Sequence, residues 1–292
     1  MKRAETVDDR ACTLAETLRF EGVGIHSGER CRVQIHPHSG GIEFAVGRVR
    51  IPALVQYAVE LHRRTALENE GVRVSTCEHL LAALYGCGVD AALVEVEGPE
   101  IPILDGSALP FVEAVRAVGL AVLDDCRREL RVTEPVWVAE GGALLAALPP
   151  ECGSEGLSVR FVLNNGGRML AGQTERLRVS ADVFAEEIAP ARTWCLAEDV
   201  DALISAGLAR GGSTENALVV YEDSYSKPLR VPNEPVRHKI LDLIGDAALL
   251  GARLTAELVG LGSGHRLNVR LFRQLAGGRL IAAEGFTKAN SG

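Results

Sequence analysis

The chain has 292 residues, of which 47% are hydrophobic and 24% are charged, as in a folded globular protein of one large or two medium domains. Its formal net charge of −8 argues against broad electrostatic attraction to nucleic acid or to an anionic membrane surface. Seven scattered cysteines without a CxxC pair indicate neither a disulfide framework nor a Cys-rich zinc site, so we expect a cytoplasmic protein. The sequence contains no signal peptide pattern and no apolar run long enough to span a membrane.

The first part of the chain has the pattern of an α+β unit. Residues 11–60 carry alternating apolar positions broken by turn residues, which predicts several short strands. A helix follows in STCEHLLAALYGCG, where Ser75 and Glu78 have the spacing of a capping box. This interpretation gives Glu78 a purely structural role. A further strand and a further helix complete a unit that we expect to span residues 1–126.

A short charged break, DDCRRE, separates this unit from a second one, which we expect to span residues 127–292. Strands are predicted at LRVTEPVWVAE, ALLAALPP and LSVRFVLN, followed by a helix capped by Ser180 or Asp182. A strand before GSGH, a helix (LNVRLFRQLAG) and a short strand (RLIAAEGF) end the chain. Similar elements recur in both halves, so the predicted fold class is α+β with two similar units.

The most informative stretch is VRHKILDLIGDAALL, residues 236–250. Wound as an α-helix, it places four polar side chains on one narrow face, whereas most of the circumference is apolar; the four are His238, Lys239, Asp242 and Asp246. Ionisable groups on a mostly buried helix are stable only when they pair with one another, with a metal ion or with a substrate. A purely structural ion cluster explains this pattern as well as a functional site does.

A metal site can be built from this helix and one earlier segment. His238 and Asp242 are four residues apart, so both can reach one cation. A catalytic zinc site takes three protein ligands, and His79 is the best candidate for the third. Glu78, beside it, could act as a general base.

His265 lies in a Gly-Ser-Gly-His turn that could direct its imidazole into a cleft. With Asp246 as its partner, its pKa would rise, and it could donate a proton or stabilise an oxyanion. Lys239 could bind the same negative charge or a substrate phosphate. These groups favour a metal-dependent hydrolase, with structural ion clusters as the alternative.

Six motifs then point to one family. The runs TCEHLLAAL, EIPILDGS, ARTW, GGS, VRHKILDLIGD and GSGH, in this order and spacing, resemble the UDP-3-O-acyl-N-acetylglucosamine deacetylases of lipid A biosynthesis. The resemblance extends from GVGIHSG to GSGH. It implies two α+β units, each a sheet with a pair of helices, packed with the helices between the sheets. It also implies a hydrolase that removes the N-acetyl group from UDP-3-O-acyl-N-acetylglucosamine, the committed step of that pathway, in the cytoplasm.

The resemblance assigns roles to the candidate residues. It implies zinc held by His79, His238 and Asp242, although two histidines and one carboxylate also suit ferrous iron. It implies that Glu78 is the general base, and either Glu78 or His265 protonates the leaving amine. The first unit would supply Glu78 and His79, and the second unit would supply the other site residues.

The resemblance also assigns roles to residues that would act on or contact the substrate. Thr193 in ARTW would steady the tetrahedral intermediate, Asp246 would support His265, and Lys239 would contact the substrate. An insert at 194–217 would form an apolar passage for the 3-O-acyl chain. The expected substrate contacts in this insert are Trp194, Val200, Gly212 and Ser213. Trp194 stands where the family usually has phenylalanine.

The expected partner is the UDP-linked acylated amino sugar, with no nucleic acid, and the chain is expected to be a monomer. Membrane contact would be at most peripheral, through the lipid-bearing substrate. Two other functions stay open: a metal-dependent deacetylase of another nucleotide sugar, and a non-catalytic protein that binds nucleotide sugars or lipids. Glu78 and His265 speak against the second, because a binding protein needs neither.

Overall fold

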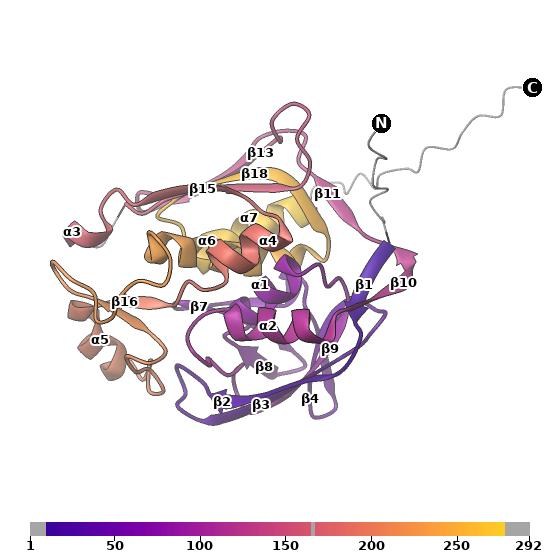
Figure 1. The fold of residues 1–292 in the computed structure, drawn as a ribbon, viewed down its shortest axis with the longest axis horizontal. Helices are drawn as coiled ribbons and strands as arrows, with labels where there is room; N and C mark the ends of the chain where they lie inside the picture. Colours follow the sequence, from indigo (N-terminus) through magenta and orange to yellow (C-terminus); the bar gives the residue numbers. More distant parts are fainter. Residues whose placement is uncertain (1–9, 165–166, 278–292) are drawn as a thin grey trace, which may run out of the picture.

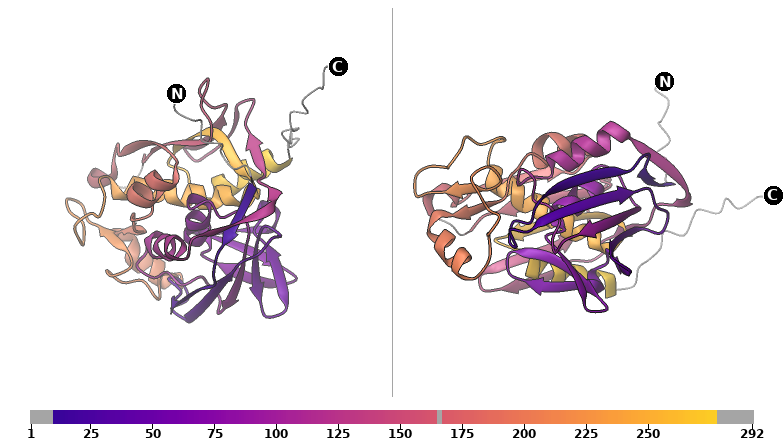
Figure 2. Two further views of the ribbon diagram at one scale, coloured as in Figure 1. Left: turned by 45° about the vertical axis from the view of Figure 1, so that its right-hand side comes forward. Right: turned by 90° about the horizontal axis from the view of Figure 1, so that it is seen from below.

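The structure, a computed structural model, describes residues 10–164 and 167–277. Two large sheets enclose a layer of helices (Figure 1). The longer helices of this layer are α1 (Glu78–Gly86), α2 (Leu109–Val118), α6 (Glu234–Ala247) and α7 (His265–Gly277). Seen from below, the strands of one sheet lie over the helices (Figure 2). The predicted α+β class is confirmed.

The first large sheet is formed by residues before α2. Its strand order is β2 (Leu18–Val23), β3 (Arg30–His36), β9 (Ala92–Glu97), β4 (Ile42–Val46) and β5 (Val49–Pro52). Only β4 and β9 are parallel neighbours. Alternate residues of β3 are buried, as expected for a strand with one face on the core.

Two smaller sheets accompany it. One contains β6 (Ala58–Leu61), β7 (Arg64–Asn69) and β8 (Val72–Ser75), and the turn η1 (Val55–Tyr57) precedes it. The other pairs β1 (Arg10–Leu14) with β10 (Leu120–Cys126). The β6–β8 sheet leads directly into α1.

The second large sheet has the order β12 (Val136–Glu140), β13 (Ala143–Leu148), β18 (Arg253–Leu261), β14 (Leu157–Val162) and β15 (Thr174–Arg178), and β11 (Glu129–Arg131) pairs with β18. Shorter elements between β14 and α6 are α3 (Gly167–Leu170), α4 (Ala181–Val183), the π-helical turn η2 (Phe184–Ile188), β16 (Trp194–Leu196), η3 (Ala197–Asp199), α5 (Val200–Ser205) and β17 (Leu218–Val220). β16 and β17 form a parallel pair.

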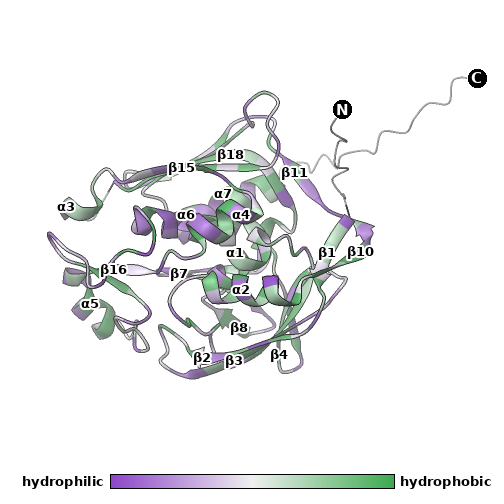
Figure 3. Ribbon diagram, viewed as in Figure 1, coloured by the Kyte–Doolittle hydropathy of each residue, from purple (hydrophilic) through white to green (hydrophobic). Residues whose placement is uncertain are grey.

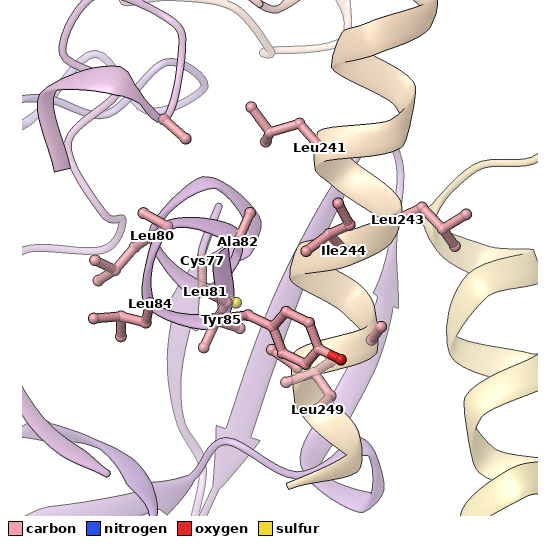
Figure 4. Close-up of a cluster of buried hydrophobic side chains, with 14 of the residues drawn as sticks. Cys77, Leu80, Leu81, Ala82, Leu84, Tyr85, Leu241, Leu243, Ile244 and Leu249 are labelled. Atoms are coloured by element: carbon pink, nitrogen blue, oxygen red, sulfur yellow. The ribbon is translucent and has the colours of Figure 1, made fainter. Parts of the chain in front are cut away.

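The contact between α1 and α6 is the centre of the molecule. Leu241 and Ile244 point from α6 toward α1, and Tyr85 reaches from α1 to the end of α6 near Leu249 (Figure 4). α1 is coloured mostly as hydrophobic, whereas polar turns alternate with apolar ones along α6 (Figure 3). Burying a leucine side chain contributes about 1.5–3 kcal/mol, so this contact holds the two halves of the chain together.

Gly245 permits this packing. A Cβ atom added there would lie 2.1 Å from the backbone oxygen of Glu78, far inside ordinary contact. Only a residue without a side chain therefore lets α6 cross α1 at this distance. The crossing brings the start of α1 beside the polar face of α6.

The helix predicted at 236–250 is confirmed, with small differences at its ends. α6 begins two residues earlier, with a proline in its first turn, and the 3-10 turn η4 (Ala248–Leu250) continues it. The cap predicted at Ser180 is also confirmed, because its hydroxyl accepts a hydrogen bond from the backbone N–H of Val183. The predicted strand RLIAAEGF lies outside the described residues.

The capping box predicted at the start of α1 is wrong. Cys77 is the N-cap residue, whereas Ser75 ends β8 and bonds through its backbone to Pro99 and Ile101. Between them Thr76 has a positive φ of 56°, which turns the chain sharply into the helix. Glu78 is therefore free of a capping role.

Two chain-level findings complete the description. All seven cysteines are free thiols. Within 10–164 and 167–277, no helix combines the length and apolar character needed to cross a membrane.

Candidate active site

Three predicted metal ligands meet where α1 and α6 cross. His79, His238 and Asp242 are all buried, and one potential ligand atom from each lies within 4.8 Å of the others. Oδ1 of Asp242 is 3.3 Å from Nε2 of His238 and 3.7 Å from Nε2 of His79. The two imidazole rings meet edge to face, with centroids 4.9 Å apart.

The protonation of these rings favours a cation. Nδ1 of His238 donates a hydrogen bond to the carbonyl oxygen of Ala191 at 3.0 Å, which leaves Nε2 as an acceptor facing the Asp242 carboxylate. Burial lowers the pKa of His238 and lowers the pKa of His79 to about 3, so both rings are neutral. Two neutral nitrogens and a carboxylate oxygen that face one another are stabilised by a bound cation. The group therefore fits a metal ion.

Lys239 partly balances the charge of Asp242. Its Nζ donates to Oδ2 at 2.5 Å, on the side away from the oxygen that faces the histidines. Burial alone would raise the pKa of Asp242, but His238 and Lys239 lower it well below its usual range. The carboxylate is thus ionised and available to a cation.

Glu78 lies beside this group at the first position of α1. Its Oε2 accepts a hydrogen bond from the backbone N–H of Thr65 at 3.1 Å, and its Oε1 is 3.9 Å from Nε2 of His265. Burial raises the pKa of Glu78 to about 7. A carboxyl group with that pKa can both take and return a proton near neutral pH.

His265, at the start of α7, is paired with Asp246 as predicted. Its Nδ1 donates to Oδ2 of Asp246 at 2.9 Å, and Asn268 donates to the same oxygen at 2.8 Å. Thr65 donates its hydroxyl to the other oxygen at 2.5 Å. Burial would lower the pKa of His265, but Asp246 and Asp242 outweigh it and raise the pKa to about 9. His265 is therefore protonated, as an imidazolium, at neutral pH.

A cavity of about 1050 Å³ opens over these groups. Its wall contains all four predicted substrate contacts of the insert, together with Thr193 and Lys239; the four are Trp194, Val200, Gly212 and Ser213. Trp194 is held in the wall because its indole N–H donates to the carbonyl oxygen of Pro235 at 3.0 Å. The structure thus gathers the predicted substrate contacts around one space, and their roles stay predictions.

Sequence reasoning missed three residues of the site. Thr65 links Asp246, His265 and Glu78, and Asn268 binds Asp246 one turn into α7. Gly245 sets the distance between the helices. Thr65 sits in an ordinary strand pattern, so no local signal marks it. Asn268 is three residues after His265 on the same helix face, a spacing that was available in the sequence.

The fold and this geometry define a class of protein: an α+β protein with a buried His-His-Asp group that could bind a catalytic metal ion. The sequence profile of the family described as LpxC, UDP-3-O-acyl N-acetylglycosamine deacetylase, matches residues 11–277. The chain belongs to this metal-dependent family.

Relatives that carry the name UDP-3-O-acyl-N-acetylglucosamine deacetylase match along most of their length. The relative from Anaeromyxobacter dehalogenans is 42% identical over 270 residues, which cover 90% of this chain and 86% of the relative. The relative from Leptospira biflexa is 36% identical over 267 residues, covering 89% and 87%. The relative from Thermosynechococcus vestitus is 39% identical over 272 residues, covering 90% and 93%.

Proposed function

We propose that this protein hydrolyses the N-acetyl group of UDP-3-O-acyl-N-acetylglucosamine, giving UDP-3-O-acyl-glucosamine and acetate, the committed step of lipid A synthesis. One observation carries the proposal: a His-His-Asp group, a buried carboxyl group and a paired imidazolium converge on the wall of one cavity. Membership of the deacetylase family supports the choice of substrate.

His79, His238 and Asp242 would hold the metal ion. We propose zinc, which two histidines and one carboxylate bind with a position left for water or substrate. Ferrous iron suits the same ligands. When bound, such an ion polarises the acetamide carbonyl and lowers the pKa of a water molecule.

The protein's own groups would then move the protons. Glu78, oriented by the backbone N–H of Thr65, takes a proton from the attacking water. His265, held as an imidazolium by Asp246, stabilises the negative charge that develops on the carbonyl oxygen. Glu78 or His265 afterwards protonates the departing nitrogen. Thr193 would steady the tetrahedral intermediate and Lys239 would contact the substrate; both line the same cavity.

The size and lining of the cavity suit a large amphipathic substrate. Drug-sized ligands occupy cavities of about 300–1,000 Å³, and this one reaches the upper end. The insert at 194–217 supplies apolar residues to it, among them Trp194 and Val200. We propose that this part of the wall lines the passage for the 3-O-acyl chain, and that Gly212 and Ser213 contact the substrate there.

The chain would divide near residue 126 into two α+β units that act together. Glu78 and His79 precede this point, and the other proposed catalytic and metal-binding residues follow it. Neither unit would be catalytic alone. We further propose a cytoplasmic monomer whose contact with membranes is at most peripheral.

Metal analysis combined with an acetate-release assay tests this function. We expect Glu78→Ala to keep its bound metal and to lose at least ~100-fold in kcat, the contribution of a general base. The control is Glu113→Ala, at an exposed position of α2. A Glu78→Ala variant with full activity would contradict the assigned role.

A substrate panel separates the alternatives. If removal of the acyl chain left kcat/KM unchanged, the enzyme would act on another nucleotide sugar. If the metal-loaded protein bound the substrate but released no acetate, it would be a binding protein.

A further inference from the structure

The insert at 194–217 contacts the first half of the chain at several places, and two of these junctions differ in kind. At the first junction, backbone groups bond directly. The N–H of Gly211 donates to the carbonyl oxygen of Ile25 at 3.0 Å, and the N–H of Arg210 donates to that of His26 at 3.3 Å. A Cβ atom added at Gly211 would lie 2.3 Å from the oxygen of Gly24, so the two loops are in close contact.

The loop on the other side of this junction is itself fixed. Oε2 of the buried Glu100 accepts hydrogen bonds from the backbone N–H groups of His26 and Ser27 and from the Ser27 hydroxyl, at 3.2, 2.8 and 2.7 Å. Its Oε1 accepts from the hydroxyl of Thr76 at 2.8 Å. The loop at this first junction is therefore held in place by four hydrogen bonds to one buried carboxylate.

The second junction is a single ion pair. A terminal guanidinium nitrogen of Arg63 lies 2.6 Å from Oδ2 of Asp199, across 136 residues of sequence. Arg63 occupies the turn between β6 and β7, and Asp199 is the residue before α5. Because Arg63 directly precedes β7, this strand begins at the end of the molecule where Figure 1 shows β16 and α5.

The carboxylate of Asp199 has no competing capping role. Asp199 is the last residue of η3, has helical backbone angles (φ −85°, ψ −16°) and makes no side-chain capping hydrogen bond to α5. A capping residue ordinarily has an extended backbone. The contact that carries this carboxylate is therefore the ion pair with Arg63.

The ion pair lies on the wall of the cavity. Leu61 and Arg63 line it from the first half of the chain, and Asp199, Val200 and Leu203 line it from the insert. The side chains of Arg63 and Asp199 are 39% and 34% exposed. A partly exposed ion pair favours its closed state by a factor of only about five, and salt weakens it.

We propose that Arg63 and Asp199 form a clasp that closes the wall of the acyl passage and sets how strongly a long acyl chain is retained. The inference rests on the proposed function, because it assigns selectivity to the same cavity. The backbone junction at Gly211 acts as the hinge side, and the clasp acts as the side that opens. Both residues act by positioning α5 and take no part in the hydrolysis.

Kinetics with substrates of different chain length test the clasp. For Arg63→Gln and for Asp199→Asn we expect KM for a dodecanoyl substrate to rise about fivefold. We expect kcat to stay unchanged and KM for a butanoyl substrate to rise less than KM for the dodecanoyl substrate, because a shorter acyl chain can make fewer contacts with the wall at α5. The reversed pair, Arg63→Asp with Asp199→Arg, should restore the long-chain KM. Arg73→Gln, which breaks an exposed ion pair with Glu68 away from the cavity, is the matched control.

Hydrogen exchange gives a readout that needs no turnover. In the clasp variants, the amides of residues 197–205 should exchange about fivefold faster, whereas those of 209–212 should keep the wild-type rate. Wild-type exchange rates in the variants would overturn the clasp, whatever the activity. An equal loss of kcat/KM with short and long substrates would overturn its role in selectivity.

The two proposals fail in different ways. If wild-type protein releases acetate but the clasp variants keep their long-chain KM, the clasp is wrong and the proposed function stands. If wild-type protein releases no acetate from any substrate, the proposed function is wrong. Faster exchange at 197–205 alone would then still support the clasp.

Discussion

Replacing Gly245 by alanine changes the distance between the two helices that carry the site. The added methyl group would lie 2.1 Å from the backbone oxygen of Glu78, whereas ordinary contact begins at 3.4 Å. α6 must therefore move away from α1 by about 1.3 Å, or tilt by an equivalent amount. Glu78 and His79 move with α1, while His238 and Asp242 move with α6.

A displacement of about 1 Å between reacting groups costs roughly 100-fold in rate. We expect Gly245→Ala to lower kcat/KM by about that factor and to bind the metal more weakly. The overpacked helix contact should lower the free energy of unfolding by about 1–3 kcal/mol, offset in part by the higher helix propensity of alanine.

An acetate-release assay, metal analysis and urea unfolding measure these three effects. The matched control is Gly277→Ala in α7, where an added Cβ atom meets no heavy atom within 4 Å. That variant should keep full activity. Wild-type kcat/KM in Gly245→Ala would refute the idea that this close approach sets the geometry of the site.

Three further predictions concern buried charges. Asp246→Asn removes the charge that holds His265 as an imidazolium, so kcat should fall about 100-fold in the acetate-release assay while bound metal is retained. Arg192→Met leaves the fully buried Glu234 carboxylate without its cation and should lower the free energy of unfolding in urea by about 3–5 kcal/mol, against less than ~1 kcal/mol for the exposed Arg116→Met. Burial would raise the pKa of Glu234, but its hydrogen bonds with Arg192 and Arg230 lower it. Its stabilising contribution is therefore complete above the ordinary carboxyl pKa of about 4.3 and is lost as the pH falls through the lowered value, so Glu234→Gln should show a shallower acid dependence of unfolding.

The strongest predictions from the sequence concern single helices. The face shared by His238, Asp242 and Asp246 follows from the 3.6-residue period, and α6 has it in the structure. The α+β class followed in the same way from local alternation and turn residues. Where the local rule failed, at the capping box, a long-range backbone contact was the reason: Ser75 bonds through its backbone to Pro99 and Ile101 and stays in β8, so that Cys77 is the N-cap residue of α1.

The sequence did not predict which distant residues contact these helices. Thr65 and Asp246 are 181 residues apart. No sequence periodicity relates β7, which carries Thr65, to α6, which carries Asp246. The same is true of the ion pair between Arg63 and Asp199. The sequence by itself determined which side chains each helix presents, because that depends on local backbone geometry. Only the tertiary structure decided which of them meet, because this depends on how the apolar faces of α1 and α6 pack and on the one glycine that lets them approach.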